Sequence, residues 1–370
     1  MTIVDGGELD LMENLDFNLA EIVGGIGPME KGWVEKARER TSKLVMPKRA
    51  LGRLHEISEK ICGIQKSLRP EINCKECLIM AGDHGVVEEG VSAYPQEVTG
   101  EMIKTFLCGG AGINILASHV GAGVRIVDMG IIPELNPDSI EGGEKFHVEK
   151  IRRGTSNFVK GPAMSHEEAE QSIVAGFQLA AKLFESGIQI LGTGDMGIGN
   201  TTPSAAIGAV ITGKSVEDMT GRGTGVDDKA FLRKKDVIRK GIELNLPDSC
   251  SGLDVLSKIG GFEIGGIAGI ILAGAYYNRP VVIDGFISTA GALIAYTLCP
   301  SITDYIFAGH CSEEPGHRIM LDFLGLKPIL DLGMRLGEGT GGALAMGIME
   351  GAVRVFNEML TFEEAGVTDK

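Results

Sequence analysis

The chain changes its pattern of apolar residues near residue 70. From 32 to 68, apolar residues recur every three or four positions between charged ones, which predicts amphipathic helices. Beyond that point, short apolar runs alternate with longer helical patterns. The runs predict buried strands over 77–81, 124–128, 188–191, 281–284 and 305–308. The patterns between them predict helices near 97–119, 166–185, 202–211, 264–277, 288–298 and 314–324.

The alternation of strands and helices predicts an α/β fold, with a parallel sheet covered by helices on both faces. A last helix, from about 341 to 359, is expected to pack with the N-terminal helices. We therefore expect a small helical domain from residues 1–70 and 341–370, and a large α/β domain from residues 71–340. Ligands of such sheets bind at the carboxyl ends of the strands, where this chain carries AGDHG, GTGDMGIGN, DGF and AGHCSEEPGH.

Charge and composition narrow the class of partner. The formal net charge is −15 and no basic patch is visible, which argues against nucleic acid and against anionic membranes as partners. A phosphate-bearing small molecule would have to be held locally, by backbone amides and one or two cations. The chain has 54 glycines, roughly twice the usual share of ~7%. Their concentration at strand–helix junctions suggests backbone that approaches a ligand closely.

The cysteines and the N-terminus indicate a cytoplasmic protein. Seven scattered cysteines occur without a basic and apolar leader, so we expect reduced thiols in the cytosol. Cys74 and Cys77 form one CxxC pair, but no second pair or pair of histidines accompanies it, so a zinc site is not favoured. The most apolar segment, 264–277, is too short to span a membrane at ~20 residues and is interpreted as a buried helix.

The strongest local signal is IQILGTGDMGIGNTTPSAAIGA. It is interpreted as a strand, a glycine loop and a small-residue helix. The amides at such a helix N-terminus form an anion site, so we favour phosphate binding over a purely structural turn. The loop is expected to contain Gly192, Gly194, Gly197 and Gly199, and the helix to be capped by Asn200, Thr201 and Thr202.

The same segment allows a second interpretation. Gly192, Gly194 and Gly197 form a GxGxxG pattern, the fingerprint of dinucleotide-binding folds. That fingerprint normally opens the first βαβ unit and is followed ~20 residues later by an acidic residue at the end of a strand. Here the residues at that distance, GKSVEDMTGRGTG, predict a loop. An NAD-dependent oxidoreductase therefore remains the alternative enzyme class, and a non-catalytic nucleotide-binding protein is a third interpretation.

Two further segments carry candidate chemistry. In TGRGTGVDDKAFLRKKDVI, Asp227 and Asp228 suit a helix start, and four cations are candidate phosphate partners or solvated surface charges: Arg222, Arg233, Lys234 and Lys235. In DLGMRLGEGTGGALAMG, Glu338 stands between two glycines before an apolar helix. A carboxylate in such a pocket would have a raised pKa and could act as a general base, which we prefer to a helix cap.

Three histidines follow predicted strands. They are His84, His310 and His317. Metal binding would require them to converge with acidic residues, and the spacing alone does not indicate it. We expect substrate-lining or structural roles, and no metal.

Together the motifs resemble those of the nicotinate-nucleotide:dimethylbenzimidazole phosphoribosyltransferases. The similarity runs from about residue 15 to the C-terminus, in family order, through GDHGVVEEGVSAYPQEVT, GTGDMGIGNTTPSAAI, GRGTGVDD, GGFEIGGIAG, DGFISTAGAL, HCSEEPGH and LGEGTGGALA. The resemblance implies transfer of ribose phosphate from nicotinate mononucleotide to a lower-ligand base, such as 5,6-dimethylbenzimidazole, in cobamide nucleotide-loop assembly. It also implies a Rossmann-like large domain, a homodimer, and no metal or redox cofactor.

The resemblance assigns roles to individual residues. Glu338 matches the family's catalytic base, and Lys234 its site lysine near the phosphate. Ser92, Tyr94 and Gln96 match the segment that lines the pocket for the aromatic base. Further substrate contacts are expected from Asp195, Gly197, Gly199, Asn200, Thr201, His310, Ser312, Leu336 and Gly337.

The sequence departs from the family pattern at two positions. Asp195 stands where many members have glutamate, which would alter the placement of the ribose or the base. Gly309 stands where a serine often precedes the histidine, which would weaken contacts to the nicotinate ring. Neither departure touches Glu338. The sequence leaves open whether the acceptor is a benzimidazole, a purine or a phenol, and whether the partner is a second copy or a related subunit.

Overall fold

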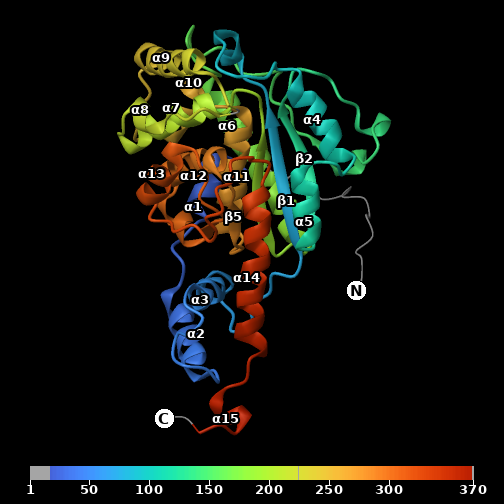
Figure 1. The fold of residues 1–370 in the computed structure, drawn as a ribbon, viewed down its shortest axis with the longest axis vertical. Coiled ribbons are helices and arrows are strands. Elements are labelled where there is room, and N and C mark those ends of the chain that lie inside the picture. Colours follow the sequence, from blue (N-terminus) through green and yellow to red (C-terminus); the bar gives the residue numbers. More distant parts are fainter. Residues whose placement is uncertain (1–16, 224, 369–370) are drawn as a thin grey trace.

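Six parallel strands form the centre of the molecule, in the order β3-β2-β1-β4-β5-β6 (Figure 1). The computed structural model describes residues 17–223 and 225–368. The strands are β1 Lys75–Gly82, β2 Ala122–Gly130, β3 Phe146–Val148, β4 Ile190–Met196, β5 Val281–Ile283 and β6 Ile306–Ala308. Every pair of neighbours is parallel, which confirms the predicted sheet. The short edge strand β3 was not predicted.

Helices follow the strands as the alternation predicted. Residues 97–119 form two helices where one was predicted, and the helices over Val216–Met219 and Gly252–Ile259 were not predicted at all. The helices of the N-terminal half are α1 Leu19–Gly24, α2 Lys31–Lys43, α3 Arg53–Gln65, α4 Val98–Leu107, α5 Gly112–His119 and α6 His166–Glu185. The later ones are α7 Thr201–Thr212, α8 Val216–Met219, α9 Asp228–Asn245, α10 Gly252–Ile259, α11 Phe262–Tyr276, α12 Phe286–Leu298, α13 Pro315–Phe323, α14 Thr340–Glu358 and α15 Phe362–Ala365. Short 3-10 helices are η1 Gly85–Glu89, η2 Pro137–Ser139, η3 Gly143–Lys145 and η4 Pro300–Asp304.

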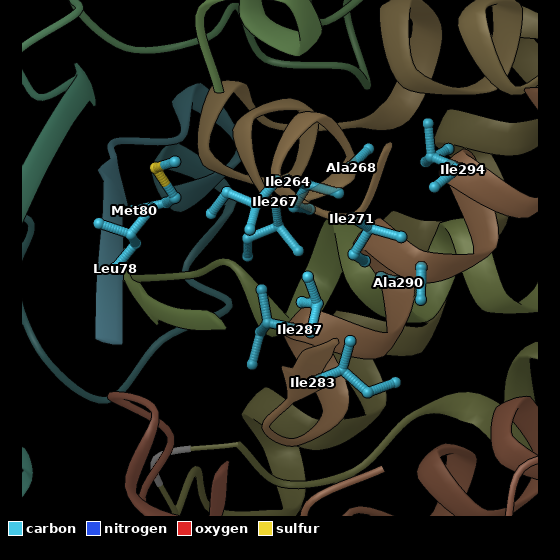
Figure 2. Close-up of a cluster of buried hydrophobic side chains, with 14 of the residues drawn as sticks. Leu78, Met80, Ile264, Ile267, Ala268, Ile271, Ile283, Ile287, Ala290 and Ile294 are labelled. Atoms are coloured by element: carbon cyan, nitrogen blue, oxygen red, sulfur yellow. The ribbon is translucent and has the colours of Figure 1, made fainter. Parts of the chain in front are cut away.

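Strand β1 shows that helices cover both faces of the sheet. Successive side chains of a strand point to opposite faces. Met80 approaches Gly266 of α11, and Figure 2 shows Leu78 and Met80 beside the isoleucines of that helix. Cys77, which directly precedes Leu78, lies beside Gly192, the glycine that Met346 of α14 also approaches. α11 and α14 therefore pack on opposite faces, as the α/β prediction required.

The helix α11 is the centre of the hydrophobic core. Its residues from Phe262 to Ala275 are all buried, which confirms the buried helix predicted for 264–277. Figure 2 shows its side chains packed between β1, β5 and α12. It also lies very close to α6: a methyl group on Gly176 would come 2.1 Å from the carbonyl oxygen of Gly266. Some of the glycine excess therefore serves helix packing, because only glycine lets two backbones approach this closely.

Strand β4 extends further than the sequence predicted. The prediction ended it at residue 191 and placed the next glycines in a loop. Instead β4 continues to Met196, so Gly192 and Gly194 lie inside a strand that pairs with β1 over its whole length. Only Gly197 and Gly199 remain in the turn. Because these first two glycines do not form a phosphate-binding turn, the structure gives the dinucleotide-binding interpretation no support.

Helices α2, α3 and the second half of α14 lie together, to one side of the sheet (Figure 1). Phe356 of α14 packs there with Ala37 and Cys62. The first half of α14 packs against β4 and β5. α1 packs against α6 and α11. The division into residues 71–340 and 1–70 with 341–370 therefore stays a prediction. Among the described residues, no helix is long and apolar enough to cross a membrane.

Candidate active site

A cavity of about 350 Å³ opens at the carboxyl ends of β4, β5 and β6. The sheet order reverses direction between β1 and β4, and ligands of such sheets bind beyond the strand ends near this point. Predicted site residues from four parts of the chain meet here. The cavity is lined by Tyr94, Asp195, Asn200, Thr201, Gly223, Gly285, Phe286, Ile287, His310, Ser312, Glu314, Arg335, Leu336 and Gly337.

Glu338 lies on a tight turn directly after the cavity-lining Gly337. The φ angles of Gly337, Glu338 and Gly339 are 81°, 61° and 89°, so three successive residues are left-handed. Glutamate rarely adopts this conformation, and the surrounding structure must hold it there. The turn rests on β4: a methyl group on Gly194 would lie 2.6 Å from the carbonyl oxygen of Glu338. The glycine in β4 is thus needed for the close approach of this turn.

The Glu338 carboxylate faces the N-terminus of α5. Its Oε2 accepts a hydrogen bond from the Ile113 N–H at 3.3 Å, and the residue is 7% exposed. Burial raises the pKa of the carboxyl, and the negative charge of Asp284 raises it further. Glu338 does not cap α14, which begins at Thr340 without a side-chain cap. A buried carboxyl with a raised pKa is suited to a general base, and that role of Glu338 stays a prediction.

Asp195, the residue at the family's glutamate position, lies on β4 beneath Gly337. A Cβ atom on Gly337 would lie 3.5 Å from both of its carboxylate oxygens. Burial, together with the charge of Asp284, raises the pKa of Asp195 to about 8. Its Oδ2 accepts a hydrogen bond from Asn200 Nδ2 at 2.9 Å. Asn200 is the N-cap residue of α7, as predicted, but its side chain bonds Asp195 and forms no cap hydrogen bond with the helix.

Two cations lie at the cavity: the exposed Arg335 lines it, and Lys234 lies behind the lining residue Thr201. This lysine is buried, and its Nζ donates to Thr201 Oγ1 at 2.6 Å. Burial lowers the pKa of the amine to about 8, although the nearby Glu314 carboxylate acts in the opposite direction. Glu314 also accepts the Gly223 N–H at 3.0 Å. One buried amine beside the N-terminus of a helix suits a phosphate group.

The other predicted cations lie elsewhere. Arg222 pairs with Asp228, while Lys235 lies over the ring of Phe231. Arg233 approaches Gly90. Of the four cations, only Lys234 reaches a residue that lines the cavity. The neighbouring Asp227 caps α9 by accepting the Ala230 N–H, as its position at a helix start predicted.

The expected substrate contacts are only partly brought together. Gly197 and Gly199 are not among the cavity-lining residues, since they pack against Gly82 and Val87. Of the expected base pocket, Tyr94 lines the cavity and is 52% exposed. Gln96 lines a neighbouring hollow of about 290 Å³ beside Asp83, and its Nε2 donates to the carbonyl oxygen of His84. Ser92 accepts the N–H of Tyr94.

The histidines at strand ends are buried and paired. His84 Nε2 lies 2.8 Å from Glu263 Oε1. His317 accepts the Ser312 N–H at Nδ1 and contacts Thr289 Oγ1 through Nε2. Thr289 donates its own hydrogen to Gly285, so His317 is the neutral Nε2–H tautomer. Among the described residues, no group of three or more histidines, cysteines or acids could hold a metal ion.

Comparisons with known proteins agree with this geometry. A sequence model of a family described as phosphoribosyltransferase matches residues 26–367. The chain belongs to this phosphoribosyltransferase family. It is 51% identical to a nicotinate-nucleotide–dimethylbenzimidazole phosphoribosyltransferase of Geotalea uraniireducens, over 95% of this chain and 98% of that protein. A protein of the same name from Desulforamulus reducens is 52% identical, over 95% and 99% of the two chains.

A solved structure supports the same assignment. The crystal structure of a phosphoribosyltransferase of this name from Thermus thermophilus superposes with a TM-score of 0.86 at 42% identity. It covers 92% of this chain and all of that one. The resemblance found from the motifs and the Rossmann-like fold are therefore confirmed. The roles of individual residues stay predictions, because these comparisons concern whole chains.

Sequence reasoning gave no role to two buried acids at this cavity. Asp284 follows β5 and is fully buried, and Glu314 lines the cavity beside Gly223. Both lie in motifs that were noted, DGF and HCSEEPGH, but neither received a role. The available signal for Asp284 was an acid directly after a buried strand. The departure at Gly309 also has a local reason here: a Cβ atom there would lie 2.8 Å from the Cα of Gly342 in α14.

Replacing Gly194 by alanine should displace the Glu338 turn of the phosphoribosyltransferase. The added methyl group would lie 2.5 Å from Ile79 Cδ1 and 2.6 Å from the Glu338 carbonyl oxygen, so the turn must shift. A shift near 1 Å at a reacting group costs about 10²-fold in turnover. Kinetics and thermal unfolding of Gly194→Ala measure this. Gly161→Ala, where the added Cβ meets nothing within 4 Å, is the control. Equal activity of the two variants would contradict the prediction.

Because His317 is buried, the free energy of unfolding of the phosphoribosyltransferase should fall at acidic pH. Burial lowers the pKa of its imidazole to about 3, against about 6.5 in an unfolded chain. Between these values only the unfolded chain binds the proton, so the free energy of unfolding falls as pH falls, by about 1.4 kcal/mol per pH unit. Urea unfolding at pH 7.5 and 5 measures the slope. His317→Gln should lower the pH slope of the free energy of unfolding by the contribution of about one proton. The control is His119→Gln, at an exposed histidine. An unaltered slope in His317→Gln would refute this.

Proposed function

We propose that this chain transfers ribose 5-phosphate from nicotinate mononucleotide to a flat aromatic base of the lower-ligand type. The observation that carries the proposal is that a buried glutamate, Glu338, follows the cavity-lining Gly337 while a buried amine, that of Lys234, bonds the cavity-lining Thr201. The relatives named above act on nicotinate nucleotide and dimethylbenzimidazole by their names. We propose the same substrate pair here, in the assembly of the cobamide nucleotide loop.

The reaction needs one proton acceptor and no protonating acid. The glycosidic nitrogen of nicotinate mononucleotide is a pyridinium, so the C–N bond breaks with its electron pair going to the ring, and neutral pyridine nitrogen leaves. A nitrogen lone pair of the azole forms the new bond to the anomeric carbon from the opposite face, which gives the α-riboside 5′-phosphate. The other ring N–H of the azole loses its proton to Glu338. The raised pKa of Glu338 suits it to accept this proton near neutral pH.

Positioning supplies the rest of the catalytic effect. We assign the phosphate to Lys234 and Thr201 at the start of α7, where the helix dipole adds to the lysine charge. Tyr94 and Leu336 are exposed apolar walls of the same cavity and suit a flat ring. Asp195, protonated near neutral pH, is able to donate a hydrogen bond to the ribose or the base. Phenolic acceptors would lose their proton to the same glutamate.

We also propose a homodimer in the cytoplasm. Exposed apolar side chains gather where α5, α14 and the segment before Glu338 meet, among them Ile115, Leu332 and Ile348. The hollow of about 590 Å³ between these elements suits a second copy, because exposed apolar patches usually mark interfaces. Seven free thiols suit a reducing compartment. The mass in solution, measured by light scattering, separates a dimer from a monomer, and co-purification from the native cell would reveal a related subunit.

The experiment that tests the proposed reaction uses the purified protein with nicotinate mononucleotide and three separate acceptors. These are dimethylbenzimidazole, adenine and p-cresol. Free nicotinate and the riboside phosphate are followed by chromatography and mass. Nicotinate release matched by product supports the transferase and ranks the acceptors. Binding of the mononucleotide without release, with every acceptor, would instead favour the binding-protein alternative.

A further inference from the structure

Asp284 links the end of β5 to the turn that carries Glu338. It follows the last residue of β5 directly and is fully buried. Its two carboxylate oxygens accept two different backbone N–H groups: Oδ2 that of Gly339 at 3.2 Å, and Oδ1 that of Gly342 at 2.9 Å. The residue thus caps α14 from a distant strand, in place of a local side chain. No role in the proposed function has yet been given to it.

These two hydrogen bonds help to fix the conformation of the turn that carries Glu338. Gly339 is both the N-cap of α14 and the last of the three left-handed residues. A bond from its N–H to Asp284 therefore holds the far end of the turn, while Gly194 of β4 supports the near end. Asp284 is itself fixed, because its N–H donates to Thr193 Oγ1 on β4 at 3.4 Å. The turn is consequently held by two neighbouring strands of the sheet.

We propose that Asp284 is a positioning residue for the reaction, which holds the Gly337–Gly339 turn and sets the electrostatic field around Glu338. This inference rests on the proposed function, since it assigns Glu338 as the base. Asp284 acts on the reaction indirectly, because it is fully buried and contacts the turn and α14, and its charge reaches both Glu338 and Asp195.

The charge of Asp284 adds an electrostatic effect to the mechanical one. Three titratable groups surround Glu338 from the sheet side: Asp195 of β4, Asp284 after β5, and His310 after β6, whose Nδ1 lies 3.5 Å from Asp284 Oδ1. From α5 the carboxylate meets the backbone amide of Ile113. The exposed Arg335 lies earlier in the same loop. Among these, Asp284 is the charge that raises the pKa of Glu338.

The test replaces Asp284 by asparagine, which keeps the shape of the side chain but removes its charge. We expect kcat to fall about 10- to 100-fold, the cost of a misplaced reacting group, with the KM for nicotinate mononucleotide changed by less than about threefold. The acid limb of the pH profile of kcat/KM should move to lower pH, because loss of the negative charge lowers the pKa of the base. A residue that only supports the fold would leave this limb in place.

Asp128 offers a matched control. It is also a buried aspartate, at the end of β2, whose Oδ1 accepts the N–H groups of Gly130 and Ile131. Asp128→Asn should lower the thermal stability but leave the pH profile unchanged. Asp284→Ser, which keeps a neutral acceptor, is the second Asp284 variant. If both Asp284 variants fail to fold while Asp128→Asn folds, Asp284 supports the whole domain and the proposal is wrong.

A double-mutant cycle with Glu338→Gln decides whether Asp284 acts through the base. In a Glu338→Gln background, Asp284→Asn should change kcat by less than about threefold, because residues that act as a unit are strongly non-additive. Additive losses would overturn the proposal, and so would an acid limb that stays in place in Asp284→Asn. Failure of the proposed function looks different: the wild-type protein itself would then release no nicotinate with any acceptor.

Discussion

Replacing Glu338 by glutamine should lower kcat for nicotinate release by about 10²- to 10⁴-fold, the usual contribution of a general base. The amide keeps the size of the side chain and can still accept the Ile113 N–H, so the left-handed turn is retained. Affinity for nicotinate mononucleotide should stay within about threefold, because Glu338 is not among the residues that line the cavity. Steady-state kinetics and calorimetric titration with the mononucleotide measure the two effects separately.

A suitable control lies on the helix that follows the turn. Glu358 ends α14 and forms an exposed ion pair with Arg354. Glu358→Gln should therefore leave turnover unchanged, since exposed pairs contribute little. Full activity in Glu338→Gln would remove the proposed mechanism. A combined loss of turnover and of mononucleotide binding would indicate a collapsed site instead of a missing base.

Replacing Lys234 by methionine should raise the KM for nicotinate mononucleotide about 10- to 100-fold, with a smaller effect on kcat. A charged hydrogen bond to a buried anion is worth about 1.5–3 kcal/mol, which corresponds to this range. The lysine is fully buried beside Thr201, so no solvent or second lysine compensates for its loss. Initial rates at varied mononucleotide concentration, with saturating dimethylbenzimidazole, measure the change.

The pH dependence gives this prediction a second measurement. The amine of Lys234 has a pKa lowered to about 8 by burial, so it is charged below that pH and neutral above it. The KM of the unmodified protein should therefore rise as pH increases through about 8, and Lys234→Met should lose this rise. Lys235→Met is the matched control on the same helix, because its amine lies over the ring of Phe231. If Lys235→Met raised the KM as much as Lys234→Met, the phosphate assignment would be wrong.

The architecture could be predicted because its signal is local and repeated. The helix 166–185 was predicted with the bounds of α6, and its capping box at Ser165 and Glu168 is visible in the sequence. The buried helix α11 and the strands β1, β2, β5 and β6 follow from apolar runs of typical length. Short segments such as β3 carried too few residues for a periodic pattern.

The glycine motif after residue 191 shows where local reasoning fails. Glycine is a turn former by itself, so Gly192 and Gly194 predicted a loop. Pairing with β1 and the close approach of the Glu338 turn keep both residues in a strand instead. Contacts with residues distant in the chain thus overrode the local preference of these two glycines. Asn200 does stand at the N-cap of α7, but its side chain bonds Asp195, five residues earlier.

The sequence by itself determined the α/β class and, through its motifs, the phosphoribosyltransferase family. The motifs had already matched Lys234 to the family's site lysine, but only the tertiary structure buried it against Thr201 and placed Asp284 beneath the Glu338 turn. Asp284 and Glu338 are distant in the chain. Asp284 follows β5 at the edge where the parallel strands have their carboxyl ends, and the turn that carries Glu338 rests on the same edge. The raised pKa values of Asp195 and Glu338 depend on that convergence and on burial, neither of which a linear sequence contains.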